Sequence, residues 1–223
     1  MHGCWHNARR CWLRRLSLLR TILVTLSGTH GTGKSTNAGR CYYLLNKSGL
    51  KFSYLRHQDI LDPFGFVLRR TARLLGFENP NDLERTRPVT VLWSIYLLFI
   101  YIPILVGGIK LRRLLGYSIV SDRYLYDLLV GFWGDRVSIP VLRLIVWVLP
   151  KPDVSFVLDA PEARILGDRP EHTASYIRME KMLYDNVADH FRLKRVSTNQ
   201  KPALVWNTMQ TEIRSAMHLP AGE

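Results

Sequence analysis

The chain has 223 residues, of which 47% are apolar and 22% are charged. This length suits one domain, and this composition excludes an intrinsically disordered chain or a low-complexity fibre. Lysine and arginine number 31 against 18 aspartates and glutamates, which gives a net charge of +13. Such a balance favours anionic partners of any kind: nucleotides, nucleic acid or an acidic membrane surface.

The positive charge is concentrated at the start of the chain. No acidic residue precedes Asp59, and five of the early cations are Arg9, Arg10, Arg14, Arg15 and Arg20. We predict that residues 1–20 form a basic N-terminal extension, as a tail or an amphipathic helix, and that residues 21–223 form a single domain.

The cysteines indicate the compartment. Cys4, Cys11 and Cys41 have the spacing of neither a disulfide framework nor a usual zinc site. The sequence therefore favours a reducing, cytoplasmic location.

From Thr21 onward, short apolar runs alternate with helical patterns. We predict strands over residues 21–27, 51–55, 117–121, 154–158 and 193–197. We predict helices over residues 33–46, 64–75, 139–149, 173–191 (with Thr173 as the N-cap) and 206–217, and a loop over 79–82. Strand, crossover helix and strand repeated in this order indicate an α/β fold, in which helices cover both faces of a parallel sheet.

One segment is long and apolar enough to cross a bilayer. Residues 89–109 carry no charge, and Arg112 and Arg113 follow them as they would at a cytoplasmic boundary. However, Pro103 and a glycine pair interrupt the run, and a crossing would place two strands of one sheet on opposite sides of the membrane. We predict a buried core helix; a transmembrane helix and a helix that lies on the membrane are the alternatives.

The most specific motif follows the first predicted strand. Residues 28–35 read G-T-H-G-T-G-K-S and fit G-x-x-x-x-G-K-[ST] at every fixed position. The glycines allow positive backbone dihedrals, and successive amides at the start of a helix form a nest for phosphate oxygens. Lys34 can reach the β- and γ-phosphates, and the Ser35 hydroxyl suits Mg²⁺. We predict an ATP·Mg²⁺ site made by Gly28, Thr29, His30, Gly31, Thr32, Gly33, Lys34, Ser35 and Thr36.

Two predicted strands are followed by an aspartate at their carboxyl ends, where open α/β sheets bind ligands. The first, Asp122, precedes Arg123 and Tyr124, and these three side chains suit a metal, a phosphate and a flat substrate. We predict that Asp122 is a metal ligand and that Asp122 and Arg123 are catalytic. For Asp159, capping of the next helix is an equal alternative.

A basic segment between two later helices is a candidate lid. Arg164 and Arg169 lie there, and a lid would stabilise charge on the transferred group and exclude water. A solvated loop between helices is the alternative.

With these motifs the chain resembles the thymidylate kinase-like family of P-loop nucleotide kinases. The resemblance covers about residues 21–215 and is carried by the P-loop and by residues 122–130, 149–162 and 173–184. It implies a three-layer α/β/α fold with five parallel strands in the order 2-3-1-4-5. It also implies ATP·Mg²⁺ as the donor and transfer of the γ-phosphoryl group to a nucleoside monophosphate.

The resemblance also implies roles for residues. Lys34 and Ser35 would hold phosphate and metal. Asp122 would act near the metal and the acceptor, and Arg123 would bridge the donor and acceptor phosphates. Arg169 would belong to the lid, and residues 197–199 would approach adenine.

The acceptor region departs from the family pattern. Residues 93–109 have no arginine where thymidylate kinases carry one, and residues 57–59 do not form the usual acceptor loop. This puts dTMP in doubt as the acceptor, and we predict that Tyr96 and Tyr101 are core aromatics.

Three alternatives stay open. One is a membrane-associated P-loop protein without nucleotide kinase activity, which touches the membrane through residues 89–109 or the basic N-terminus. Another is a kinase that phosphorylates a different small metabolite. Separately, a homodimer is a possible oligomeric state of the protein. A nucleic-acid binder is suggested by the charge alone, because the sequence shows no recognition motif.

Overall fold

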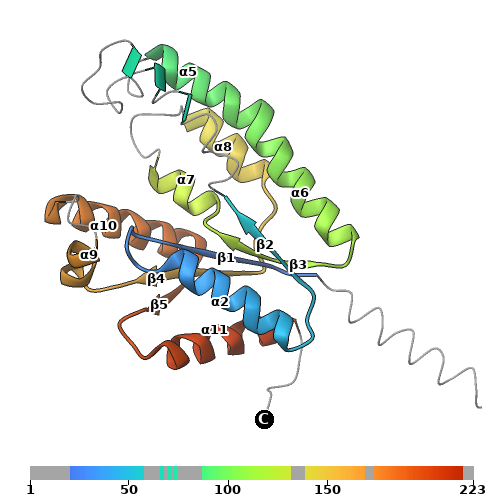
Figure 1. Ribbon diagram of the computed structural model, residues 1–223. Coiled ribbons are helices and arrows are strands. Elements are labelled where there is room, and N and C mark those ends of the chain that lie inside the picture. Colours follow the sequence, from blue (N-terminus) through green and yellow to red (C-terminus); the bar gives the residue numbers. More distant parts are fainter. Residues whose placement is uncertain are drawn as a thin grey trace, which may run out of the picture.

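The structure is a computed structural model, and it describes residues 21–57, 66–67, 70–71, 73–74, 87–131, 139–168 and 173–217. Five strands form one sheet in the order β2-β3-β1-β4-β5, and every neighbouring pair is parallel (Figure 1). The strands are β1 (Leu23–Gly28), β2 (Phe52–Arg56), β3 (Ser118–Asp122), β4 (Val154–Asp159) and β5 (Lys194–Ser197). The predicted α/β fold and the strand order 2-3-1-4-5 are confirmed.

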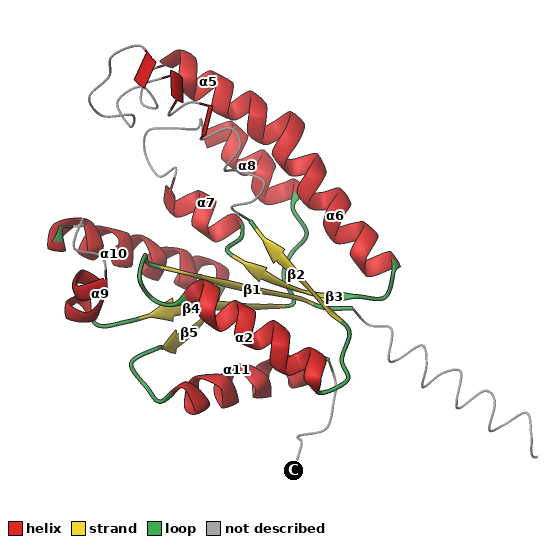
Figure 2. Cartoon of the chain, in the orientation of Figure 1, coloured by secondary structure: helices red, strands yellow, loops and turns green. Residues whose placement is uncertain are grey.

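Helices connect the strands, as parallel pairing requires (Figure 2). The first crossover contains α2 (Lys34–Lys47). The remaining helices are α5 (Arg87–Tyr96), the π-helical turn η1 (Leu97–Tyr101), α6 (Ile102–Leu114), α7 (Leu125–Gly131), α8 (Ile139–Val148), α9 (Glu162–Asp168), α10 (Ala174–Phe191) and α11 (Pro202–Ala216).

The alternation of side chains along β1 divides the core between the two faces of the sheet. Val24 and Leu26 pack against α2 and α11 in one buried cluster. Leu23, between them in the sequence, packs on the opposite face with residues of α5, α6, α7 and α8. On that same face Val157 of β4 packs against α7 and α10. The result is the three-layer α/β/α arrangement seen in Figure 1.

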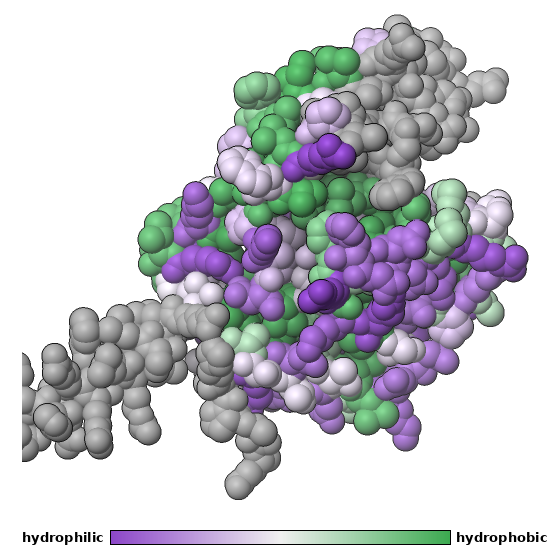
Figure 3. All heavy atoms as spheres, turned by 180° about the vertical axis from the view of Figure 1, so that it is seen from behind, coloured by the Kyte–Doolittle hydropathy of each residue, from purple (hydrophilic) through white to green (hydrophobic). Residues whose placement is uncertain are grey.

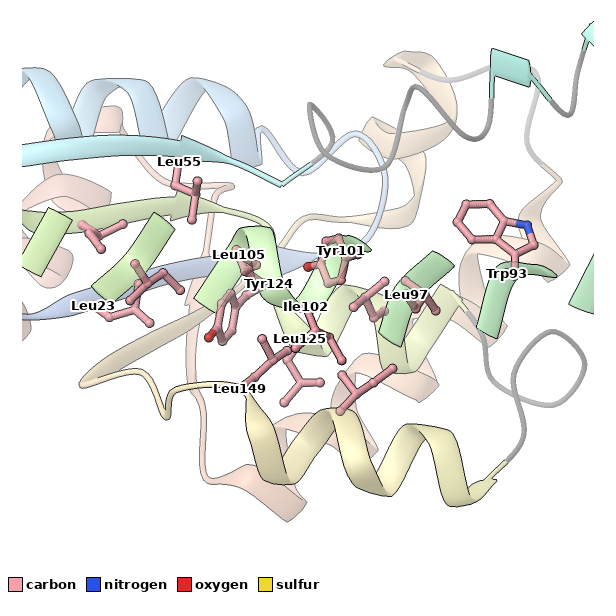
Figure 4. Packing of buried hydrophobic residues seen from close by; sticks show 14 of the residues in the cluster. Leu23, Leu55, Trp93, Leu97, Tyr101, Ile102, Leu105, Tyr124, Leu125 and Leu149 are labelled. Carbon is pink, nitrogen blue, oxygen red and sulfur yellow. The ribbon is translucent and has the colours of Figure 1, made fainter. Parts of the chain in front are cut away.

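The segment 89–109 lies in one long helical run, made by α5, η1 and α6. Every fourth residue of this run is buried in one cluster with the sheet and the neighbouring helices: Val89, Trp93, Leu97, Tyr101, Leu105 and Ile109. Figure 4 shows four of them, Trp93, Leu97, Tyr101 and Leu105, within this cluster. The π-helical turn lies just before Pro103, which has no backbone N–H to donate. A wider turn at this point lets the helix continue past the proline.

The opposite face of this run is exposed, so the prediction of a buried core helix holds for one face only. Among the described residues, one helix, Val91–Leu114, has the length and hydropathy to cross a membrane, and 33% of its most apolar window is buried. Tyr101 is fully buried, as predicted for a core aromatic.

The ends of the helices can be compared with the boundaries predicted from the sequence. The Thr173 side chain accepts a hydrogen bond from the Tyr176 amide at 3.3 Å, which confirms the predicted N-cap of α10. The last helix begins at Pro202, four residues before the predicted start at Trp206. A proline fits in the first turn because the backbone N–H groups there have no partner within the helix, so its missing N–H costs nothing. Within the predicted helix 64–75 the six described residues are helical, whereas the loop 79–82 and the extension 1–20 lie outside the described residues.

Candidate functional site

The predicted phosphate loop lies at the carboxyl edge of the sheet, between β1 and α2 (Figure 1). The backbone dihedral φ is +141° at Gly28, +78° at Gly31 and +77° at Gly33. Residues with a side chain rarely adopt a positive φ, so all three positions favour glycine. At Gly28 the backbone of β4 also excludes a side chain, because an added Cβ would lie 2.2 Å from the carbonyl oxygen of Leu158.

The amides at the start of α2 are free of side-chain caps. Gly33 is the N-cap and offers no capping side chain, and the first turn contains no acidic residue. These amides, together with the positive end of the helix dipole, therefore point to an anion as the partner of this turn.

Lys34 is buried and folds back over the loop. Its Nζ donates hydrogen bonds to the carbonyl oxygens of Gly28 and Thr29, both at 2.6 Å. Burial lowers its pKa to about 8, although the negative charge of Asp127 acts in the opposite direction. The charges of Arg123, Glu180 and Asp122 also influence this pKa. Ionisable groups of β3, of the turn after it, of α7 and of α10 thus lie near enough to Lys34 to influence its charge.

Asp122 lies at the end of β3, adjacent to β1 in the sheet. Its Oδ2 accepts a hydrogen bond from the Tyr54 hydroxyl of β2 at 3.0 Å. Its Oδ1 is buried and has no hydrogen-bond partner in the described structure. A buried carboxylate oxygen without a partner is costly, so this atom is ready for a ligand.

Arg123 follows in a left-handed backbone conformation, with φ of +70°. Its amide donates to the Leu26 carbonyl at 2.9 Å, and its own carbonyl accepts from the Ser121 hydroxyl at 2.7 Å. Its side-chain Nε is buried and, within the described structure, has no partner. These backbone contacts hold a conformation that residues other than glycine rarely adopt, and strain of this kind often occurs at functional positions.

Asp127 is a central member of the site to which the sequence analysis gave no role. Its Oδ2 accepts hydrogen bonds from the Ser27 hydroxyl at 2.6 Å and from the Tyr124 amide at 3.1 Å. Its Oδ1 accepts from the Tyr184 hydroxyl at 2.9 Å. One carboxylate thereby links β1, α7 and α10 behind the phosphate loop. A second acidic residue five positions after Asp122 was the only sequence signal for it.

Glu180 of α10 is the second residue that the sequence analysis missed. Its carboxylate accepts from the backbone amide of His30 at 3.2 Å and lies 2.7 Å from Nδ1 of the His30 ring. Burial acts to raise the pKa of Glu180, but the hydrogen bonds and charge of His30 and the charge of Lys34 lower it overall. These contacts fix the loop against α10. No sequence pattern marks a contact between residues 150 positions apart.

His57 lies directly after β2, on the side where an acceptor was predicted. It is fully buried, its amide donates to the Asp122 carbonyl at 3.2 Å, and the Tyr101 hydroxyl lies 2.7 Å from its ring nitrogens. Burial, with a smaller effect from the charge of Arg123, lowers the pKa of His57 to about 3. A neutral imidazole therefore lies between Tyr101 and the end of β3.

Asp159 and Arg164 lie on the β4–β5 side of the loop. Asp159 forms an ion pair with Lys181 at 2.7 Å, and none of its described hydrogen bonds caps α9. Arg164 donates to the Thr198 carbonyl at 2.6 Å, which ties α9 to the segment that follows β5. Arg169, the predicted lid residue, lies outside the described residues.

A cavity of about 340 Å³ opens beside the phosphate loop. It lies between the ends of β4 and β5 and α10, and its lining includes Thr29, Asp159, Lys181, Tyr184, Ser197 and Gln200. This volume is within the range of small-molecule sites. The segment 197–199, predicted to approach adenine, therefore borders a cavity next to the loop.

The residues present fit a magnesium nucleotide. Mg²⁺ in such sites takes few protein ligands and keeps phosphate oxygens and waters around it. Asp122 offers an unpartnered carboxylate oxygen, and Ser35 offers an exposed hydroxyl in the first turn of α2. Within the described ranges, no three acidic, histidine or cysteine side chains gather into a metal cluster. Asp122 and Ser35 are therefore the described oxygen donors that such a cation could use.

Comparisons with known proteins identified no relative of this chain. The sequence matches no protein-family model, and no curated protein gives a significant match. The fold is a three-layer α/β/α domain with a parallel sheet in the order 2-3-1-4-5.

Proposed function

We propose that this protein is a P-loop kinase that transfers the γ-phosphoryl group of ATP·Mg²⁺ to a nucleoside monophosphate. The observation that supports this most is geometric: Lys34 contacts the carbonyls of the glycine-rich loop, and Asp122 and the Arg123 amide lie beside Leu26, at the end of the strand that leads into the loop. Two cations and a carboxylate with an open oxygen beside a nest of amides suit a polyphosphate with its metal.

The donor would be held by the loop and by α2. The amides of residues 29–34 would bind phosphate oxygens, and Lys34 would leave the carbonyls of Gly28 and Thr29 to contact the β- and γ-phosphates. Ser35 and Asp122 would hold Mg²⁺, which supplies charge neutralisation when bound. The cavity bordered by Thr29 and Ser197 would take the nucleoside part of ATP.

Catalysis would depend on positioning and on charge. The guanidinium of Arg123 would stabilise the charge that spreads over the transferred phosphoryl group, and Asp122 would orient the acceptor side of the site. Asp127 contacts Ser27 and Tyr184 and would act as a positioning residue behind the loop. Arg169 stays a predicted lid residue.

Transfer to a different small metabolite is the second candidate. Two observations favour it: residues 93–109 contain no arginine, and Tyr101 is buried against the ring of His57. This candidate needs the same donor site and differs only in the acceptor. Under either proposal the enzyme acts in the cytoplasm.

The test is a product assay with a matched variant. Purified full-length protein is incubated with Mg·ATP and each nucleoside monophosphate, and beside these with small phosphorylated and hydroxylated metabolites. We expect stoichiometric formation of ADP and one phosphorylated product. In Lys34→Ala we expect the rate to fall by about 10²–10³-fold, because an electrostatic contact to the transferred group is lost.

Lys47→Ala is the control, since Lys47 is an exposed cation in the last turn of the same helix. A product formed from a metabolite but from no nucleoside monophosphate would select the second candidate. Full activity of a folded Lys34→Ala protein would contradict both.

A further inference from the structure

The long helical run made by α5, η1 and α6 carries a row of exposed apolar side chains, here called the apolar helix face. Each is about half exposed or more: Val91, Leu92, Ile95, Phe99, Ile100, Ile104, Leu111 and Leu114, with Leu115 directly after α6. Phe99 is 74% exposed and Leu114 is 84% exposed. Figure 3 shows apolar residues gathered along the edge of the molecule where this run lies. A row of large exposed apolar side chains along one helix indicates a binding surface.

Within α5, η1 and α6 every charged residue is a cation, and Arg113 among them is paired with Asp153. Between Glu84 and Asp122 the sequence contains no acidic residue. Lys110 is exposed beside the face, and Arg112 donates to neutral oxygens, those of the Ser53 hydroxyl and the Gly108 carbonyl. The apolar helix face therefore complements a surface that is apolar inside and negative at its rim.

The neighbouring α8 has a similar composition. It packs in the same buried cluster through Ile145, and it exposes Trp147, whose exposed fraction is 82%, and Arg143. Tryptophan and phenylalanine with flanking cations are typical of helices that lie in a membrane interface.

We propose that the apolar helix face docks on the surface of a bilayer that contains anionic lipids, with the helix axis parallel to the membrane plane. The helix does not cross the bilayer, because Trp93, Leu97 and Leu105 on its other face belong to the core of the domain. A second copy of the chain suits this face less well, since it would bring the same cations and a further net charge of +13.

The test is co-sedimentation of the full chain with phosphatidylcholine vesicles that contain or lack phosphatidylserine. We expect binding to the anionic vesicles and at least tenfold weaker partitioning for Phe99→Glu and for Leu114→Glu, because each places a charge where an apolar side chain meets lipid. Lys110→Glu is expected to weaken binding about fivefold or more on anionic vesicles.

The matched control is Leu204→Glu on α11, which lies on the opposite side of the sheet and is 52% exposed. It should bind vesicles like the wild type, and circular dichroism checks that every variant is folded. The proposal is overturned if the wild type binds no vesicles, or if Phe99→Glu and Leu114→Glu bind as tightly as the wild type, which would assign binding to the basic residues 1–20. A dimer that Phe99→Glu dissociates, seen by ultracentrifugation without lipid binding, would also overturn it and assign the face to a second copy.

Discussion

At the end of β1 a single carbonyl group determines which residue can occupy position 28. An alanine Cβ there would overlap the Leu158 oxygen, and the φ of +141° would strain any side chain. We expect Gly28→Ala to lower the free energy of unfolding by about 3 kcal/mol or more, measured by urea denaturation. Gly39→Ala in α2 is the control: nothing lies within 4 Å of its added Cβ, and better helix propensity should stabilise the fold by about 0.5–1 kcal/mol. Equal effects would contradict the described turn.

A second prediction at this scale concerns His57 and pH. Burial lowers its pKa in the folded protein to about 3, against 6.5 for the free side chain. Between these values the unfolded chain binds the extra proton, so the free energy of unfolding falls as the pH drops below 6.5. The limiting slope is about 1.4 kcal/mol per pH unit. Below about pH 3 both states are protonated, and this contribution has been lost.

Urea denaturation between pH 6.5 and about pH 5 measures this effect. His57→Asn should lose about 1–2 kcal/mol less stability over this range than the wild type. Tyr101, Asp122 and Arg123, the polar groups that surround His57, are retained in both proteins. His190→Asn on the exposed surface of α10 should keep the wild-type slope. A wild-type slope in His57→Asn would show that the imidazole is not held neutral.

At the scale of elements, the α5–η1–α6 run has one face buried in the core and one face exposed. Leu105 is fully buried, whereas Leu111 of the same helix is 58% exposed. We expect Leu105→Ala to cost about 2–5 kcal/mol in the free energy of unfolding and Leu111→Ala to change it by less than about 0.5 kcal/mol. Denaturation of the two variants side by side checks this. Similar losses would mean that both faces are buried.

Elements were predictable where the signal is local. The strand before the phosphate loop, the glycine pattern of the loop and the Thr173 cap each depend on a few adjacent residues. The long helix was predicted only in part, because the pattern that buries every fourth residue from Val89 to Ile109 is embedded in an apolar run on all sides. Hydropathy alone cannot separate a buried face from an exposed one in such a run.

At the scale of the whole molecule, the order of the strands determines where in the fold the candidate site lies. The chain leaves β1 through α2 over one face of the sheet, and it leaves β3 through α7 and α8 over the other. The carboxyl ends of β1 and β3 therefore flank a topological switch point, where open α/β sheets bind ligands. The phosphate loop and Asp122 meet there for this reason.

The rest of the site depends on contacts that span the chain. Asp127 reaches Ser27 across 100 positions and Glu180 reaches His30 across 150. Only the packing of α7 and α10 against the sheet brings these pairs together. The sequence could therefore predict that the loop, Asp122 and Arg123 belong to one site, but for the groups that fix them it held only a weak signal, the second acidic residue at position 127.

The most direct test of the account is a calorimetric titration of the full chain with a non-hydrolysable ATP analogue and Mg²⁺. We predict saturable binding to one site per chain, at least about tenfold weaker for Lys34→Ala and unchanged for Lys47→Ala. A wild-type protein that shows no saturable binding, or a folded Lys34→Ala protein that binds the analogue as tightly as the wild type, would contradict the claim that this loop holds a nucleotide.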